Sequence, residues 1–186
     1  MRRAPLSILP TSQLITLDDL AAICPLSKRS RIEPFVEPLN AAMEEFEINN
    51  VARETMFLAQ IAHESEGFRY VRELASGEAY EGRSDLGNSE VGDGIRFKGR
   101  GLIQITGRAN YQAVGEALSH DFIADPEALE RPAFACRSAA WFWASRKLNE
   151  LADAGDFRKI TKRINGGYNG MADRETYLAK AQEVLA

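Results

Sequence analysis

The chain has few of the residues that build metal cages and disulfide scaffolds. Its 186 residues include two cysteines, Cys24 and Cys136, and two histidines, His63 and His120. Two cysteines are too few for a disulfide-dense secreted scaffold or a cysteine-rich zinc module. Two histidines so far apart in the sequence also argue against a histidine metal cage. We therefore expect chemistry that uses neither a metal nor a cofactor.

Long hydrophobic runs and an excess of positive charge are also missing. No stretch approaches the roughly 20 apolar residues of a membrane span. Pro5 and Pro10 interrupt the region where a secretory signal would lie. We therefore expect synthesis in a reducing cytoplasm, no signal peptide and no stable membrane insertion. The formal net charge is −4 and the pI is about 5.4, which argues against a nucleic-acid partner.

The residues that are present fit one globular domain. The composition is 45% hydrophobic and 27% charged, which supplies enough apolar side chains for a sizeable core. Residues 1–15 are rich in Pro, Ser and Thr and are predicted to form an N-terminal arm, with a single domain over residues 16–186. No heptad seam or large apolar surface run is evident, so we expect a monomer.

Apolar residues at helical spacing predict helices on both sides of a glycine-rich middle. The predicted helices cover residues 16–24, 32–46, 51–66, 109–118, 131–149, 156–164 and 172–185. Residues 67–107 contain nine glycines, which favour turns and short strands, and 102–106 is expected to be a strand or an extended stretch. The expected fold class is mainly α, with this irregular segment between two helical groups.

Two basic runs carry alternative interpretations. Residues 28–31 are predicted to be a solvated basic turn, with contact to an anionic surface as the alternative. Residues 158–163 are predicted to lie on a helix with a solvated basic face, and contact with an anionic polymer or membrane surface is the alternative there.

The candidate chemistry comes from carboxylates, because the sequence has no Gly-x-Ser-x-Gly elbow, P-loop or dinucleotide fingerprint. Glu64 lies seven positions after Phe57, so it shares the apolar face of its predicted helix, near the C-terminal end. Burial and the helix dipole both disfavour a charged carboxylate there, as a general acid requires. Simple pairing with an arginine is the equally weighted alternative.

Glu73 is the next candidate. On one straight helix it would lie about 13 Å from Glu64 along the axis and on the opposite face. Gly67 offers a break that could turn the chain and return Glu73 to the same cleft. Other nearby acids remain open as candidates: Glu66, Glu78, Glu81, Asp85, Glu90 and Asp93. Two carboxylates across a cleft, one protonated and one ionised, are the minimal equipment for glycoside hydrolysis.

Several side chains near these acids suit a sugar, although each alone is more often structural. The aromatic candidates for stacking are Phe68, Tyr70, Tyr80, Phe97 and Tyr111. The candidates for hydrogen bonds to hydroxyl or acetamido groups are Gln104, Thr106, Asn110 and Asn165.

A series of motifs resembles glycoside hydrolase family 19, and its phage endolysin branch more than its plant chitinases. The motifs cover roughly residues 51–177 and are Phe57–Ser65, Arg72-Glu73, Tyr80–Arg83, Leu86–Asn88, Gly92–Gly94, Phe97–Tyr111 and Ile164–Gly167. The resemblance implies a lysozyme-like α+β fold with two lobes around a substrate cleft. It also implies inverting hydrolysis of β-1,4 bonds between N-acetylated amino sugars.

The resemblance assigns roles residue by residue. It makes Glu64 the general acid and Glu73 the general base, expected about 6.5–9.5 Å apart in an inverting enzyme. Thr106 is similar to the residue that helps to hold the attacking water, and Arg174 to the arginine that pairs with the base. The remaining residues expected to contact substrate are His63, Tyr80, Gln104, Tyr111 and Asn165, with Arg174 also counted at the binding site.

The resemblance leaves the polymer to be chosen. Chitin and peptidoglycan share the β-1,4 backbone, and the catalytic pair does not distinguish them. The scarcity of cysteine and the expected lack of a signal favour an endolysin. Such a protein stays in the host bacterial cytoplasm until release and then cuts the peptidoglycan glycan strand in the periplasm. A bacterial chitinase acting on chitin oligomers is the alternative, and a catalytically inactive sugar-polymer-binding module is the third interpretation.

Overall fold

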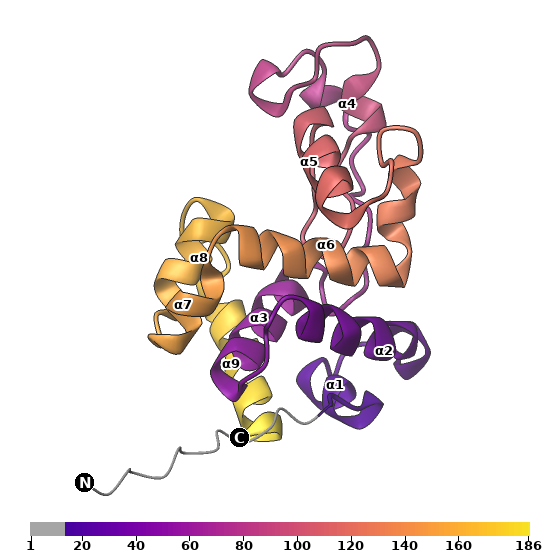
Figure 1. Ribbon diagram of the computed structural model, residues 1–186. Coiled ribbons are helices and arrows are strands. Elements are labelled where there is room, and N and C mark those ends of the chain that lie inside the picture. The colour runs from indigo at the N-terminus through magenta and orange to yellow at the C-terminus, as the bar shows by residue number, and fades with distance from the viewer. Residues whose placement is uncertain (1–13) are drawn as a thin grey trace, which may run out of the picture.

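The computed structural model describes residues 14–186 (Figure 1). Most of the predicted arm, residues 1–15, therefore lies outside the described residues. Ile15 is described and belongs to the core: it is 2% exposed, and its backbone N–H donates to Asn40 Oδ1 at 2.9 Å.

The described part of the chain is helical. It contains α1 (Leu17–Ile23), α2 (Arg29–Glu45), α3 (Val51–Glu64), η1 (Glu78–Tyr80), η2 (Ser84–Leu86), α4 (Asp93–Arg96), α5 (Arg108–Leu118), η3 (Pro126–Glu130), α6 (Pro132–Ser145), α7 (Leu148–Asp153), α8 (Phe157–Asn165) and α9 (Met171–Leu185). Among these helices, none combines the length and the apolar character that crossing a bilayer demands. The predicted fold class is confirmed.

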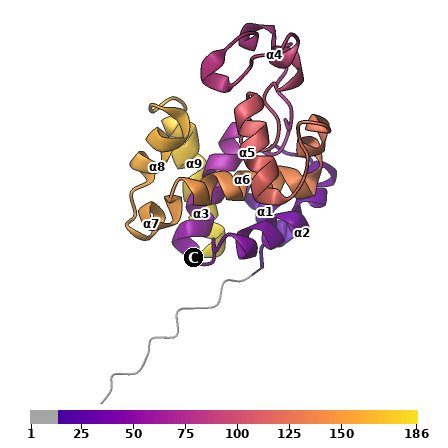
Figure 2. The same ribbon diagram turned by 45° about the horizontal axis from the view of Figure 1, so that its top comes forward.

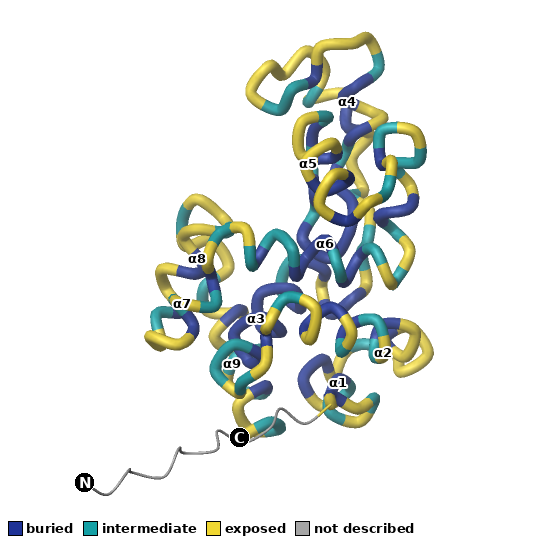
Figure 3. The backbone as a smooth tube through the Cα atoms, viewed as in Figure 1, coloured by how far each residue is buried: buried dark blue, intermediate teal, exposed yellow. Residues whose placement is uncertain are grey.

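The helices form two groups joined by α6. Helix α3 packs against α9, and α1 contacts both α2 and α9, which gives a lower group in Figure 1. Helix α6 crosses the middle of the molecule and packs against both α2 and α5. The segment that holds α4 extends away from the lower helices in both views (Figures 1 and 2). The buried residues concentrate along α3 and α6 (Figure 3), where the Phe57 and Trp143 rings meet edge to face at 5.4 Å.

Polar residues at the predicted helix starts explain where two helices begin. Thr16 and Asp19 form a reciprocal capping box at α1. The side chain of Asn50 accepts a hydrogen bond from the Arg53 backbone N–H at 2.9 Å and caps α3. Both caps satisfy backbone N–H groups that a helix start otherwise leaves unpaired.

Three predicted boundaries were wrong. The expected basic turn at 28–31 is the start of α2, with Lys28 as its N-cap. The helix predicted for 131–149 is two helices, because the chain bends at Lys147, whose φ is +52°. The indole N–H of Trp143 donates to Asn149 Oδ1 across this bend at 2.8 Å. The predicted strand or extended stretch at 102–106 is a turn flanked by isolated bridges that join Arg100 to Arg72 and to Ile105.

Candidate active site

Glu64 and Glu73 line the same open pocket, of about 380 Å³. Glu64 is the last residue of α3, and Glu73 follows in the glycine-rich segment. The other residues of this pocket are Glu66, Tyr70, Arg72, Leu74, Ala75, Tyr80 and Gln104. The structure therefore brings together the two carboxylates that the sequence placed in one cleft.

The chain reverses between the two carboxylates through an unusual turn. Glu66, Gly67 and Phe68 all have positive φ, at +48°, +68° and +64°. The Ser65 hydroxyl accepts a hydrogen bond from the Phe68 N–H at 2.8 Å and donates to the Ile61 carbonyl at 2.7 Å, so the turn is tied to α3. The helix ends where the sequence predicted a break, although three residues rather than one glycine adopt the left-handed conformation.

Glu73 is held mainly by backbone. Its Oε2 accepts a hydrogen bond from the Gly99 N–H at 3.0 Å and another from the Tyr80 hydroxyl at 3.1 Å. Its own N–H donates to the Gly99 carbonyl at 3.0 Å. Burial and the neighbouring Glu73 carboxylate raise the pKa of Tyr80, so the phenol remains a donor. Glu73 Oε1 is buried and accepts no hydrogen bond from the described residues.

Glu64 is held by a buried arginine. Arg174 on α9 is 1% exposed, and its Nη2 donates to Glu64 Oε1 at 2.5 Å. The structure shows the arginine pairing, which was the alternative interpretation of Glu64, and places the carboxylate in a cleft; its role as general acid stays a prediction. The prediction that Arg174 pairs with Glu73 was wrong. The arginine approaches from the core under α3, on the Glu64 side, and its burial excludes direct contact with substrate.

A chain of buried polar side chains fixes Arg174 in turn. Its Nη1 donates to Gln60 Oε1, and Gln60 Nε2 donates to Thr161 Oγ1 at 2.8 Å. Gln60 and Thr161 are both 0% exposed, and they come from α3 and α8. We name Thr161, Gln60, Arg174 and Glu64 the Glu64 relay. It joins three helices behind a single carboxylate.

Sequence reasoning missed Gln60 and Thr161. A polar residue on the apolar face of a helix is a signal that could have found Gln60, because buried polar groups are paired in folded proteins. Its partners lie 101 and 114 residues away, so no local pattern could have named them.

His63 and Asn165 lie at the edge of the Glu64 relay. His63 Nδ1 lies 2.6 Å from Asp173 Oδ2, and His63 lines a second pocket that also reaches Glu64. Asn165 is exposed at the C-terminus of α8, and its side-chain amide donates to the Asn169 carbonyl at 3.4 Å. That same carbonyl accepts a hydrogen bond from Arg174 Nε at 3.3 Å.

Gln104 and Thr106 occupy the wall next to Glu73. Gln104 lines the Glu73 pocket and a neighbouring pocket of about 140 Å³, which Thr106 also lines. The Thr106 hydroxyl donates to the Gln104 carbonyl at 2.9 Å. A methyl group at Gly99 would lie 2.7 Å from both Glu73 Oε2 and Gln104 Oε1, and 3.3 Å from Thr106 Oγ1. Glycine therefore lets three polar groups converge on one small space.

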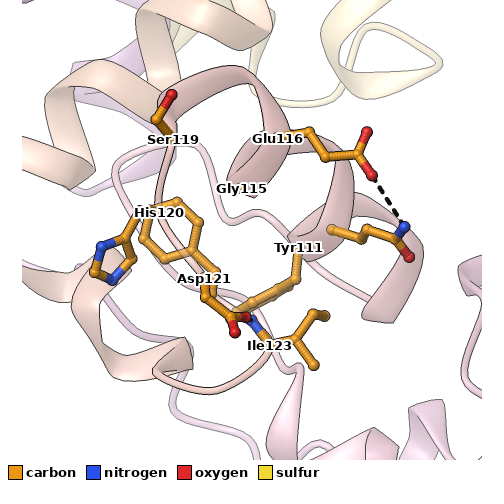
Figure 4. Close-up of a pocket in the computed structure, with 9 residues that line it drawn as sticks. Tyr111, Gly115, Glu116, Ser119, His120, Asp121 and Ile123 are labelled. Carbon is orange, nitrogen blue, oxygen red and sulfur yellow. Dashed lines mark hydrogen bonds between the residues drawn. The ribbon is translucent and has the colours of Figure 1, made fainter.

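Tyr111 does not line the carboxylate pocket, so that prediction was wrong. Its side chain is 0% exposed, and its hydroxyl donates to the Lys98 carbonyl at 2.6 Å and accepts from Arg100 Nη1 at 2.9 Å. It borders a separate cavity of about 290 Å³ beside α5, where its neighbours include His120 and Ile123 (Figure 4). Phe68 and Phe97, proposed as stacking residues, are also core residues at 1% and 0% exposure.

Asp93, an acidic residue of the glycine-rich segment, has a structural role. Asp93 accepts hydrogen bonds from the Ser89 and Glu90 N–H groups and from Arg108. The Arg108 contact is the largest cause that lowers the pKa of Asp93, to about 2. Among residues 14–186, no group of three His, Cys, Asp or Glu side chains is arranged to hold a metal ion.

Comparisons with known proteins identify the family and the fold. The family model of glycoside hydrolase family 19, described as chitinase class I, matches residues 49–173. A glycosyl hydrolase family 19 domain-containing protein of Haemophilus influenzae is 33% identical over 170 residues, which cover 74% of this chain and 82% of the relative. An endochitinase of Arabidopsis thaliana is 39% identical over 111 residues, which cover 59% of this chain and 38% of the plant protein.

Solved structures match the fold. Chitinase C from Streptomyces griseus superimposes with a TM-score of 0.76 at 21% identity, over 92% of this chain and 76% of that one. A bacterial family 19 chitinase gives a TM-score of 0.77 at 20% identity, over 94% and 96% of the two chains. The family model, the bacterial relative and the shared fold lead to one conclusion: the chain is a chitinase-like member of glycoside hydrolase family 19.

Proposed function

We propose that this protein hydrolyses β-1,4 glycosidic bonds of the peptidoglycan glycan strand by an inverting mechanism, with Glu64 as general acid and Glu73 as general base. The observation that carries the proposal is the pair of carboxylates that face one open pocket from two separately built walls. An inverting pair is expected about 6.5–9.5 Å apart, which leaves room for a water molecule.

The acid step uses the free edge of Glu64. Arg174 holds Oε1, and no described residue donates a hydrogen bond to Oε2. In the protonated enzyme, the acid proton moves to the glycosidic oxygen as the bond to the anomeric carbon breaks. The proton therefore leaves with the departing sugar hydroxyl, and the ionised Glu64 remains paired with Arg174.

The base step uses Glu73. The Gly99 N–H and the Tyr80 hydroxyl fix Oε2, so the carboxylate cannot swing away from the pocket. The Glu73 carboxylate takes one proton from a water molecule, whose oxygen bonds to the anomeric carbon. Gln104 and Thr106, on the adjacent wall, suit contacts to the sugar and to this water. After the products leave, Glu73 gives its proton to solvent water and Glu64 takes one from solvent, which restores both groups for the next cycle.

Peptidoglycan is favoured by three arginines of the cleft, which lie beside four acidic side chains, Glu64, Glu66, Glu73 and Asp173. Arg31, Arg69 and Arg72 line the two pockets that meet at Glu64. Chitin is uncharged, whereas peptidoglycan carries carboxylates on the peptides attached to its lactyl groups. Both cysteines are free and buried, which suits folding in a reducing bacterial cytoplasm before release to the wall. We therefore place the activity in lysis of the host cell from within.

Chitin cleavage is the second candidate, because endochitinases are among the relatives. The two functions separate when wild type and Glu64→Gln are assayed on purified Gram-negative sacculi and on a soluble chitin hexamer. We expect reducing-end release from sacculi, loss of about 100- to 10,000-fold in Glu64→Gln, and weak hexamer cleavage. Hexamer cleavage without release from sacculi would replace the proposal by the chitinase.

The stereochemistry of hydrolysis at the anomeric carbon is tested in a separate experiment. Proton NMR of the first hexamer products should show the α-anomer in excess before mutarotation, as inversion at a β-linkage requires. An initial excess of the β-anomer would overturn the inverting assignment. Binding of the hexamer without any hydrolysis would indicate the inactive binding module.

A further inference from the structure

We propose that the pocket beyond Glu64 binds the carboxylate-bearing peptide attached to the glycan, with Arg31 and Arg69 as its specificity-determining residues. This inference rests on the proposed function. The pocket has a volume of about 500 Å³ and is separate from the one that holds Glu73. We name it the side pocket; its lining residues are Leu26, Ser27, Arg31, His63, Glu64, Glu66, Arg69, Asp173 and Tyr177.

The side pocket adjoins the site proposed for the reaction. Glu64 and Glu66 line both it and the Glu73 pocket, so the two pockets meet at the proposed acid. A glycan held between Glu64 and Glu73 would carry its nearest substituents past Glu64. A substituent on the sugar beside Glu64 would therefore lie next to the side pocket.

The charges of the side pocket leave one cation free. Glu64 is paired with Arg174, and Asp173 lies 2.6 Å from His63. Arg69 approaches Glu66 only to 4.0 Å, and its side chain is 56% exposed. Among the described residues, the guanidinium of Arg31 forms no hydrogen bond or ion pair, although it is exposed at the pocket wall. An arginine fork of this kind is suited to a carboxylate ligand.

The remaining lining suits the rest of such a peptide. Leu26 is 98% exposed, and the partly buried Tyr177 ring adds a second apolar surface. Exposed apolar side chains next to cations fit the methyl groups and carboxylates of a short alanine- and glutamate-containing peptide. The exposed Glu66 carboxylate offers a contact for an amine at its far end. Uncharged N-acetylglucosamine would use none of these charges.

The test compares two forms of one polymer. Initial rates of reducing-end release are measured on intact sacculi and on sacculi stripped of their peptides by an amidase, and the ratio of the two rates is calculated. We expect this ratio to fall about three- to fivefold in Arg31→Ala and in Arg69→Ala, as for loss of an exposed charge contact. Arg31→Lys, which keeps the charge, should restore part of the ratio.

Arg29→Ala is the matched control, because Arg29 lies on the same helix, is exposed, pairs with Asp18 and does not line the side pocket. It removes one positive charge and should keep the wild-type ratio. A wild-type ratio in Arg31→Ala and Arg69→Ala would overturn the inference while leaving peptidoglycan cleavage intact. An equal fall in Arg29→Ala would also overturn it, in favour of general charge attraction. Failure of the proposed function looks different: wild type would release nothing from either preparation yet cleave chitin hexamer.

Discussion

Glu64 and Glu73 belong to two regions that hold a carboxylate in different ways. In the helical region, side chains from α3, α8 and α9 form the Glu64 relay, which ends in an ion pair. In the glycine-rich region, the backbone of Gly99 and a phenol hold Glu73 without any cation. The Glu64 relay depends on side chains from three helices, whereas Glu73 depends on the close approach of the backbone at Gly99. The two regions should therefore fail through different substitutions.

Gly99→Ala is expected to have the largest effect. The added methyl would lie 2.7 Å from Glu73 Oε2, so the carboxylate has to move. A displacement of about 1 Å at a catalytic group costs roughly 100-fold in rate. The measurement is kcat on sacculi together with the melting temperature, and activity should fall far more than stability.

Gly155→Ala is the control for this substitution. Its methyl meets no atom within 4 Å, but its φ of +72° strains an alanine. Stability should fall while activity per folded molecule stays at the wild-type level. If Gly99→Ala keeps wild-type activity, backbone does not position Glu73 and the contrast between the regions is lost.

Gln60→Leu should disrupt the Glu64 relay in the helical region. The change leaves Arg174 Nη1 and the Thr161 hydroxyl without their partner in the core. We expect a loss of about 2 kcal/mol in the free energy of unfolding, as for unpaired buried polar groups, and about a tenfold fall in kcat as Arg174 loosens. Urea unfolding and kcat measured against pH will test this.

Thr161→Val removes only the hydroxyl from the same network and keeps the shape of the side chain. It should give a smaller loss of both quantities. An unchanged pH profile in Gln60→Leu, with stability lost, would limit the relay to a structural role.

The substitution Asp93→Asn tests whether backbone hydrogen bonds alone hold the glycine-rich region. Arg108 and two backbone N–H groups lower the pKa of Asp93 from 3.8 to about 2. A lowered pKa stabilises the fold above pH 4, and this contribution is lost as the pH falls from about 4 to 2. Asp93→Asn should lower the free energy of unfolding by roughly 1–2 kcal/mol at pH 7. Near pH 2 its stability should approach that of the wild type. Equal costs at pH 7 and pH 3 in thermal unfolding would contradict this assignment.

Tyr80→Phe should have the smallest effect. It removes one of the two hydrogen bonds to Glu73 Oε2 and leaves the Gly99 N–H in place. We expect kcat to fall about three- to tenfold, as for loss of about 1 kcal/mol. A loss as large as that of Gly99→Ala would show that the phenol, rather than the backbone, positions the carboxylate.

The sequence supplied the catalytic candidates because short-range patterns encode them. Helical spacing placed Glu64 on a buried face, and the glycine after it indicated the turn that returns Glu73. The same patterns missed the bend at Lys147 and predicted a strand or an extended stretch at 102–106. In both places tertiary contacts outweigh the local conformational preference. The packing of α6 and α7 accompanies the bend at Lys147, and the bridges at Arg100 hold residues 102–106 in a turn.

The order of helices, the irregular middle and the position of Glu64 on its helix follow from the sequence, because periodicity and glycine content act within a few residues. Among the nearby acids, only the resemblance to glycoside hydrolase family 19 singled out Glu73. The partner of Arg174, the burial of Tyr111, the Gln60–Thr161 contact and the meeting of Arg31 with Glu64 in the side pocket required the tertiary structure. Each depends on groups that are distant in the chain, and only the packing of α2, α3, α8 and α9 decides which of them meet.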